Sequence, residues 1–572
     1  MNRILFVIAV FSATILPLVA YLYMGFHRRS HTSDAEDFFV YKRTLDYKDF
    51  ANTSVGYALQ MAAIFLFADW GYRYGFGGFW VPVFWLLGYL LLYLLIPKLG
   101  PFISKTWTLH GFLRNRFGSP MLQVVAALAT ILGLWGTMMV EVDYCTSVYQ
   151  SFLGTDWQQG GTFVLGLFFL AFGVSYVVYG GYKATVNNER LQVPIAYTFF
   201  LIVILVLLTM VRNAGYEKEF GIIWYILLFL FLLMIFAKMN LIGRSKASRE
   251  PYFADKQIII PVFGILFLLL LRLITTQAES VSFAQMPGLY ENISAQAKAQ
   301  GIVALVSLFV ANFFWMPVDI STWQRISSIH VDPSLPESRR FTPIKKGVFR
   351  VMLESPISWG FGVVFGMTLK YSGLFAVQDD AASGISKFTE ALTNFQIQGM
   401  GIGNNVSFLF PIFIVAMIAI MLSTIDELLS AITFTAFDDV IERREGSIEN
   451  GALGRRALNK ARLTTLGICV VGAFVYYGFR YIYKVEIATV LYTFYSSQLA
   501  LFPSVFGSLY GKKRMGVAAI WSIILGIVAA FVTSFIGATK SIDLSLVSPL
   551  SCLFVATITY WLISAVTNNR KE

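Results

Sequence analysis

Two adjacent hydroxyl residues, Ser423 and Thr424, lie in the middle of an apolar stretch that covers residues 405–435. In a helix, a hydroxyl lies close to the backbone carbonyl three or four residues earlier. Ser423, Thr424 and the carbonyl of Ile420 can therefore present three neutral oxygens to one side. Such oxygens suit a hard monovalent cation such as sodium. In the alternative interpretation, both hydroxyls only bond to the preceding turn.

Asp319 is a second polar residue in apolar surroundings, within the sequence NFFWMPVDISTWQR. Pro317 cannot continue an unstrained helix, and it frees a backbone carbonyl. A broken membrane helix is tolerated only where it lines a cavity or is buried in protein, so an acid just after the break indicates a polar site. In the alternative interpretation, Asp319 lies at a helix end and pairs with Arg325.

Other polar residues also interrupt the apolar stretches. Gln60 falls in the middle of the stretch 53–73, where its amide needs partners. Asp69 in the same stretch is four residues from Arg73, and this spacing predicts an ion pair. Three further acids fit either paired acids at a membrane interface or site residues: Glu141, Asp143 and Glu354.

The elements that position these residues follow from the composition. Of the 572 residues, 57% are hydrophobic and only 13% are charged, whereas a soluble domain carries about 25% charged residues. This composition excludes a large soluble enzyme, a disordered chain and a fibrous one. Apolar runs of about 20 residues, which is the length that crosses a membrane, recur along almost the whole chain. The sequence therefore predicts an all-helical polytopic membrane protein.

We predict about fifteen transmembrane helices from these runs. The basic residues concentrate in alternate connections between them, such as 25–50, 98–118, 183–192, 322–350 and 441–462. Because cytoplasmic loops carry excess Lys and Arg, this alternation predicts an outer N-terminus and a cytoplasmic C-terminus. The predicted spans are 4–24, 53–73, 77–97, 121–145, 162–182, 193–212, 220–240, 257–275, 301–321, 351–372, 405–435, 463–482, 486–511, 515–537 and 545–565.

The net charge and the cysteine and histidine content limit the classes of function that the sequence allows. The net charge of +11 fits the same cytoplasmic excess and does not indicate a nucleic-acid partner. The three cysteines and four histidines are scattered, without the spacing of metal ligands. The connections between spans are too short for a catalytic domain and contain no set of catalytic side chains, so we expect no enzyme.

Five segments together resemble the sodium:solute symporters, the family of bacterial proline and sodium/galactose transporters. They occur in the family's order, and the last one ends at residue 441. Together they make the resemblance specific, although each alone is a weak signal. The segments are AEDFFVYKRTLDYKDFANTSVGYALQM, TWTLHGFLRNRFGS, GGYKATVNNERLQ, VDISTWQRISS and MLSTIDELLSAITFTAFDDVI.

The resemblance implies a LeuT-like fold with two inverted repeats of five helices, whose first helices are broken at the membrane midplane. It divides the chain into an N-terminal helix and loop (1–50), a first repeat (51–215), an inserted helical hairpin (216–298), a second repeat (299–512) and two C-terminal helices (513–572). The hairpin departs from the thirteen-helix pattern that is common in the family.

The resemblance also implies a sodium site. Ser423 and Thr424 match the family's sodium-binding pair, and Ile420 supplies a carbonyl. Gly56 and Leu59 match the carbonyl donors of the first broken helix. Ala58 stands where proline transporters carry an acid, and further departures prevent the transfer of a substrate: Asn188-Glu189 for the family's Thr-Asp, Glu427 for Ser and Leu428 for Gln.

The resemblance predicts a secondary active transporter that couples sodium to the symport of a small polar organic solute by alternating access. The expected solute pocket lies at the two helix breaks, near Gln60, Phe314, Trp315 and Asp319. The expected partners are sodium, the solute and the lipid bilayer, in a bacterial inner membrane. A transporter-like solute sensor and a proton-coupled transporter are the alternatives. Proton coupling would depend on Asp319, Glu141 or Glu354.

Overall fold

The structure is a computed structural model that describes residues 3–26, 32–103, 108–153, 160–213, 222–242, 295–371, 409–442, 455–478, 487–511, 515–539 and 547–569. Within these ranges the regular structure is helical, apart from one isolated β-bridge between Leu45 and Ile329. The prediction of an all-helical protein is confirmed. The predicted span 257–275 lies outside the described residues.

The helices follow the predicted apolar stretches closely. Ten of the described helical stretches are long and apolar enough to cross a membrane, or up to eleven if a bent pair counts as one span. These residues do not confirm the predicted number of fifteen. The helices are α1 (Arg3–Phe26), α2 (Ala35–Val40), α3 (Tyr47–Ala58), α4 (Met61–Tyr74), α5 (Trp80–Ile103), α6 (Leu109–Phe117), α7 (Pro120–Leu153), α8 (Gly160–Asn213), α9 (Ile222–Ile242), α11 (Ala295–Trp315), α12 (Ile320–Ser328), α13 (Glu337–Arg340), α14 (Thr342–Tyr371), α16 (Leu409–Thr435), α17 (Arg455–Tyr477), α18 (Ile487–Leu499), α19 (Phe502–Tyr510), α20 (Gly516–Thr539) and α21 (Ser548–Asn569).

One predicted connection is wrong. Residues 183–192, predicted as a basic loop, are helical and belong to α8. The chain turns earlier, at Gly181, whose φ of 54° is a left-handed value that favours glycine. A Cβ at this position would clash with the carbonyl oxygen of Phe38, so the close approach of the N-terminal segment also requires glycine. The polarity of 183–192 arises because these residues face other helices and not because they form a loop.

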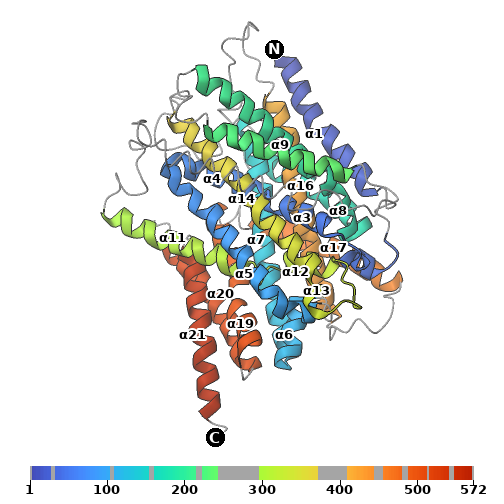
Figure 1. Ribbon diagram of the computed structural model, residues 1–572, viewed down its shortest axis with the longest axis vertical. Coiled ribbons are helices and arrows are strands. Elements are labelled where there is room, and N and C mark those ends of the chain that lie inside the picture. Colours follow the sequence, from blue (N-terminus) through green and yellow to red (C-terminus); the bar gives the residue numbers. More distant parts are fainter. Residues whose placement is uncertain are drawn as a thin grey trace.

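α16 lies at the centre of the bundle. Almost every residue of this helix from Ile414 to Thr435 is buried, and it packs against α1, α3, α7 and α8. Figure 1 shows α20 and α21, in red, as a pair at the C-terminal end, and they pack on α18 and α11. A polar residue on α16 is therefore surrounded by protein, and this is where Ser423 and Thr424 lie.

The segments that are predicted to share one side of the membrane do meet at one end of the bundle. The N–H of Leu45 donates to the carbonyl of Ser328 at 2.9 Å. The Arg116 guanidinium donates to the carbonyl of Ser508 at 2.6 Å. The contacts support the predicted grouping of the basic segments, while their orientation relative to the membrane stays a prediction.

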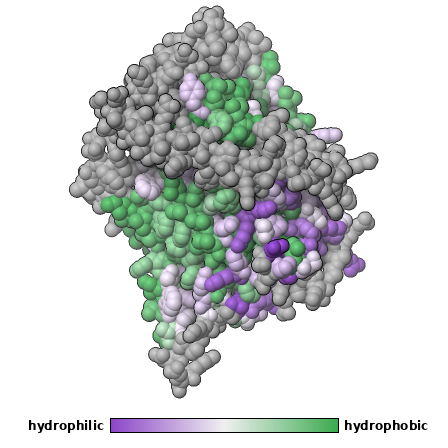
Figure 2. All heavy atoms as spheres, viewed as in Figure 1, coloured by the Kyte–Doolittle hydropathy of each residue, from purple (hydrophilic) through white to green (hydrophobic). Residues whose placement is uncertain are grey.

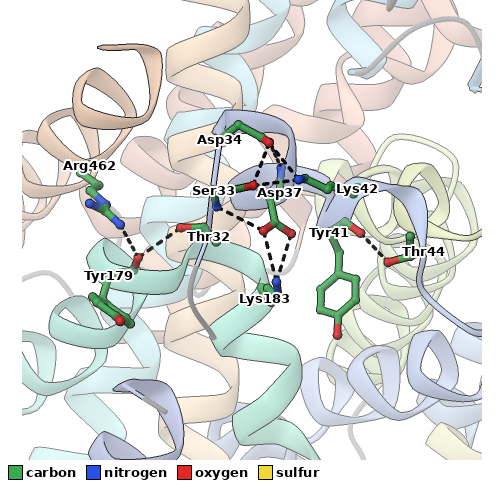
Figure 3. A network of polar contacts seen from close by, with 10 residues as sticks. All are labelled: Thr32, Ser33, Asp34, Asp37, Tyr41, Lys42, Thr44, Tyr179, Lys183 and Arg462. Carbon is green, nitrogen blue, oxygen red and sulfur yellow. Dashed lines mark hydrogen bonds and ion pairs between the residues drawn. The ribbon is translucent and has the colours of Figure 1, made fainter. Parts of the chain in front are cut away.

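The segment 32–44 is attached to this end by the polar network in Figure 3. The Lys183 ammonium on α8 lies 3.1 Å from the Asp37 carboxylate. The carbonyl of Tyr179, also on α8, accepts a hydrogen bond from Arg462 on α17 at 2.9 Å. The network joins the N-terminal segment to two long helices just before the chain enters α3.

The surface separates by polarity on the face in Figure 2. Apolar side chains cover the helices on one part of this face, and hydrophilic ones gather over α12 and α13. Large apolar side chains are exposed on the outer helices, with Trp561 and Phe535 65% and 70% exposed. In water such exposure would oppose folding, whereas in a bilayer it faces hydrocarbon.

A buried network around Asp439 fixes the end of α16. Asp439 Oδ1 accepts hydrogen bonds from Thr108 Oγ1 at 2.7 Å and Gln123 Nε2 at 2.8 Å. Asp439 Oδ2 lies 2.7 Å from His110 Nδ1, and the other nitrogen of this ring lies 2.9 Å from Thr130 Oγ1. One carboxylate thus joins the α6 region and α7 to the π-helical turn (Ala436–Ile441) that follows α16.

We expect Asp439→Ala to lower the melting temperature of the purified protein strongly. The substitution leaves three buried polar groups without their acceptor, and each such group costs about 1–3 kcal/mol. The control is Asp332→Ala, since the Asp332 carboxylate accepts two local bonds at the surface, from the N–H and the hydroxyl of Ser334. Equal melting temperatures for the two variants would contradict a structural role for the Asp439 network.

Candidate functional site

The first core helix is broken between α3 and α4. The two halves are bent by 57° to one another. The break lies at Leu59 and Gln60, where the backbone leaves the helical conformation and Gln60 is extended (φ −69°, ψ 139°). The predicted break of the first core helix is therefore present, in the middle of the predicted span 53–73.

Two other helices bond to the backbone groups that the break frees. The Trp359 indole on α14 donates to the carbonyl of Ala58 at 2.7 Å. The Glu141 carboxylate on α7 accepts from the N–H groups of Met61 at 2.8 Å and Ala62 at 3.1 Å. Because buried backbone groups need partners, these contacts allow an irregular backbone deep in the bundle.

α3 and α16 meet at Gly56 and Ser423. A Cβ at Gly56 would lie 2.7 Å from Ser423 Oγ, which is closer than real Cβ contacts come, so any larger residue would force the neighbouring side chains to move. Thr424 Oγ1 donates to the carbonyl of Ile420 at 3.2 Å, as the bond to the preceding turn predicts. Ser423 bonds differently, because its hydroxyl donates to Glu189 at 3.3 Å.

Glu189 is a candidate site residue that the sequence analysis did not select. It lies on α8, fully buried, and its Oε1 would be 2.9 Å from a Cβ at Gly56. Its Oε2 has no hydrogen-bond partner among the described residues. The sequence does contain a signal for Glu189. Asn188-Glu189 stands where the family has Thr-Asp, so an acid is kept at the second position.

The donor set at this contact fits a monovalent cation. Hydroxyls of Ser423 and Thr424 and carbonyls near the break are hard oxygen ligands, and hard cations prefer oxygen. The carboxylate of Glu189 adds negative charge in a buried position, where an unpaired charge is costly. The described residues contain no group of three or more His, Cys, Asp or Glu side chains that would hold a metal ion.

The second break separates α11 from α12 at residues 316–319. Asp319 is the N-cap of α12, and its carboxylate accepts from the N–H groups of Ser321 at 3.1 Å and Thr322 at 3.0 Å. An N-cap carboxylate satisfies N–H groups that a helix start leaves free. Arg325 lies farther away, with Nη2 3.9 Å from Asp319 Oδ2.

The comparisons with known proteins agree with this geometry. The model of the sodium:solute symporter family matches residues 55–277, a stretch that begins beside Gly56. The resemblance to the sodium:solute symporter family is confirmed. The comparison with curated proteins found no match.

Solved structures of transporters resemble the whole chain. A Na⁺-coupled sialic acid symporter in a substrate-bound outward-open state has a TM-score of 0.57 at 13% identity, covering 97% of this chain and 98% of its own. Mhp1, a nucleobase-cation-symport-1 family transporter in a closed conformation with bromovinylhydantoin bound, has a TM-score of 0.46 at 10% identity, covering 95% and 96%. The first likeness confirms the LeuT-like fold. The chain thus resembles a transporter family in sequence and fold, and its apolar helices indicate a multi-pass membrane protein.

Aromatic rings bring the two helix breaks of the chain together. Trp315, the last residue of α11, stacks between Tyr57 of α3 and Tyr495 of α18, with ring centroids 6.1 Å and 4.9 Å away. Phe314 points elsewhere, since its ring packs on Phe502 of α19 at 4.6 Å. Of the predicted solute residues, Trp315 lies between the two breaks, and Phe314 packs away from the breaks. Gln60 and Asp319 are the N-cap residues of α4 and α12, the helices that follow the breaks.

Arg325 links the two breaks to α16. It is fully buried, and its guanidinium lies 4.5 Å from the centroid of the Tyr57 ring. Its Nη1 is 4.0 Å from Glu427 Oε2, on the other side from Asp319. The second alternative for Asp319, an ion pair with Arg325, is therefore present together with the N-cap.

The structure also shows where the other buried acids lie and which side chains they contact. Glu354 accepts from the Tyr197 hydroxyl at 3.0 Å and lies 3.5 Å from Arg350, so it is a paired acid. Asp143 is buried on α7. Asp426 accepts from the Tyr176 hydroxyl at 2.8 Å. With Glu189 and Glu427, Asp426 makes three buried acids along the contact between α8 and α16.

Proposed function

We propose that this protein is a secondary active transporter that couples sodium to the symport of a small polar organic solute by alternating access. The observation that carries the proposal is the contact of Gly56 with Ser423 and Glu189, which brings the backbone of α3 beside oxygens of α16 and α8 at one buried point. The family match over residues 55–277 supports the same function. A bacterial inner membrane remains part of the proposal.

The sodium ion would be held between the first broken helix and α16. Its proposed ligands are the carbonyls of Gly56, Leu59 and Ile420 and the hydroxyls of Ser423 and Thr424. Because the ion joins α3 to α16, its binding would favour the conformations in which these helices are in contact. Coupling to the solute then requires that each ligand raise the affinity for the other by the same factor.

The solute would bind between the two helix breaks. The aromatic faces of Tyr57 and Trp315 offer an apolar platform there, and the breaks supply polar backbone. Gln60 and Asp319 remain proposed solute residues at the starts of α4 and α12. Phe314 has the weakest support, because its ring packs toward α19.

The proposed division of the chain follows the two breaks. We propose that 51–215 and 299–512 form the two inverted repeats, since each begins with a broken helix. The segments 1–50 and 513–572 then flank the core. The proposed hairpin 216–298 lies largely outside the described residues, which include its first helix, α9.

Proton coupling is a second candidate, and one observation favours it. Four acids are buried in this region, Asp319, Glu189, Asp426 and Glu427, and two of them, Asp319 and Glu427, flank Arg325, the one fully buried arginine among the described residues. Such an excess of negative groups in a low dielectric needs cations, which can be protons as well as sodium. A sodium-specific response separates the two candidates.

The test is the melting temperature of the purified protein in sodium and in potassium at equal ionic strength. A ligand that binds only the folded state raises stability by mass action, by about 2.7 kcal/mol at one hundred times its dissociation constant. We expect sodium to stabilise the wild type and to have no specific effect on the Ser423→Ala/Thr424→Ala variant. The control is Thr465→Ala, which removes a buried hydroxyl on α17 that bonds only to its preceding turn.

Two outcomes contradict the sodium proposal. One is that the wild type melts at the same temperature in sodium and in potassium. The other is that the double variant keeps the full sodium response. Stabilisation by low pH in place of sodium would favour proton coupling.

A further inference from the structure

Glu141 lies at the start of α4, where transporters with broken helices bind an anionic group of the substrate. Its side chain is fully buried on α7. Both carboxylate oxygens accept hydrogen bonds from the first two residues of α4, Met61 at 2.8 Å and Ala62 at 3.1 Å. The carboxylate therefore sits on the N-terminus of the second half of the first core helix, at the proposed solute site.

Such an N-terminus is a natural anion site. The first N–H groups of a helix have no partner within it, and the helix dipole places partial positive charge there. In transporters with discontinuous helices, half-helix N-termini point at anionic groups of the substrate. α4 has 14 residues, so it is a helix of substantial length. Here its N-terminus is already occupied by an anion of the protein.

The contact is not an ordinary helix cap. Caps come from the residue at the helix start, but Gln60 holds that position and its side chain makes no capping bond. Glu141 is 80 residues away in sequence and reaches across from another helix. None of the ion pairs found in the described part of the chain includes Glu141. The two N–H groups and the helix dipole are thus its main compensation.

The neighbouring side chains hold Glu141 in this place. Phe65, one turn into α4, stacks on Tyr144, one turn along α7, with centroids 5.6 Å apart. α4 and α7 are therefore joined at the break by a stacked pair and by the carboxylate. This arrangement keeps the negative charge at the end of α4.

We propose that Glu141 is a built-in anion that fills the carboxylate position of the solute site, so that the transported solute is a neutral polar or cationic molecule without a free carboxylate. The inference rests on the proposed transport function and names its substrate class. A solute carboxylate would have to displace Glu141 from two hydrogen bonds or bind beside a buried negative charge. A cationic or hydroxyl-bearing group meets neither obstacle.

The first experiment is chemical rescue of Glu141→Ala. This variant exposes the N–H groups of Met61 and Ala62, and a small carboxylate can replace the lost side chain. We expect choline acetate to raise the melting temperature of Glu141→Ala by several degrees relative to choline chloride, and to leave the wild type unchanged. The control is Met138→Ala, which opens space on the same helix while Glu141 stays in place.

No response of folded Glu141→Ala to acetate, or an equal response of Met138→Ala, would overturn the anion position. If Glu141→Ala does not fold, Glu141→Gln serves, because it keeps the side-chain shape and one acceptor. Removal of the charge should then let carboxylate solutes bind at least tenfold more tightly to Glu141→Gln than to the wild type. Equal binding to both proteins would overturn the inference.

The second experiment screens solutes with the wild type alone. Sugars, polyols, amines and quaternary ammonium compounds are compared with monocarboxylates and amino acids, by melting temperature in sodium and by uptake into proteoliposomes. We expect the best solute to lack a free carboxylate, and a carboxylate as the best solute would overturn the inference. Failure of sodium to act in any assay would instead count against the proposed function, and it would leave the acetate rescue unaffected.

Discussion

Gly56→Ala is expected to abolish most of the sodium-specific stabilisation while the protein still folds. The added Cβ would lie 2.7 Å from Ser423 Oγ and 2.9 Å from Glu189 Oε1, so both oxygens must move. These atoms end side chains, and they can move without unfolding the bundle. Alanine also favours a helix by about 1 kcal/mol over glycine, which partly offsets the strain.

The measurement is a sodium titration of the melting temperature at constant ionic strength. We expect the apparent sodium affinity of Gly56→Ala to fall at least tenfold, which corresponds to about 1.4 kcal/mol. Gly467→Ala on α17 is the matched control, because a Cβ there meets nothing within 4 Å. An unchanged sodium affinity in Gly56→Ala would show that the ion binds elsewhere.

The sequence predicts this contact only in part. An apolar helix interrupted by Ser423 and Thr424 indicates a polar face, but it does not identify the helix that this face meets. The resemblance supplied Gly56 as the partner, and the structure shows the two residues in contact. The structure shows where these residues lie, and their role in sodium binding stays a prediction.

Glu189 and Glu141 show what the sequence could not supply. Both are buried acids, and acids inside a membrane protein need partners. Periodicity assigns a residue to a helix face, but it does not show which backbone or side chain lies opposite. Glu141 bonds to N–H groups 80 residues earlier, and these groups are free only because α3 and α4 are separated. Its role depends on a tertiary contact and on a helix break at once.

The helix boundaries were predictable where hydrophobicity decides them. α1, α20 and α21 agree with the predicted spans to within a few residues, because lipid-facing helices are defined by their apolar length. The prediction failed at 183–192, where charged residues continue a helix. There Lys183 pairs with Asp37, and Arg190 pairs with Asp49 at 2.7 Å. Tertiary partners make polar residues compatible with a long helix.

Arg325→Met is expected to have the largest effect on stability. The guanidinium of Arg325 is fully buried between Asp319 at 3.9 Å and Glu427 at 4.0 Å. Its removal leaves two buried carboxylates without their cation, and breaking a buried pair in this way costs about 3–5 kcal/mol. We expect a large fall in melting temperature, with methionine retaining much of the packing against Tyr57.

The control for Arg325→Met is Arg190→Met. Arg190 forms a tighter pair with Asp49, but its side chain is 27% exposed, so water replaces the lost contact. A loss of stability no larger than that of Arg190→Met would contradict a central role for the buried guanidinium. The double variant Arg325→Met/Glu427→Gln should recover part of the loss, because it removes one of the unpaired charges. Arg325 contacts the first break through Tyr57, the second break through Asp319, and α16 through Glu427. The recovery would therefore show that the charge of Arg325 holds together the three elements that surround the proposed site.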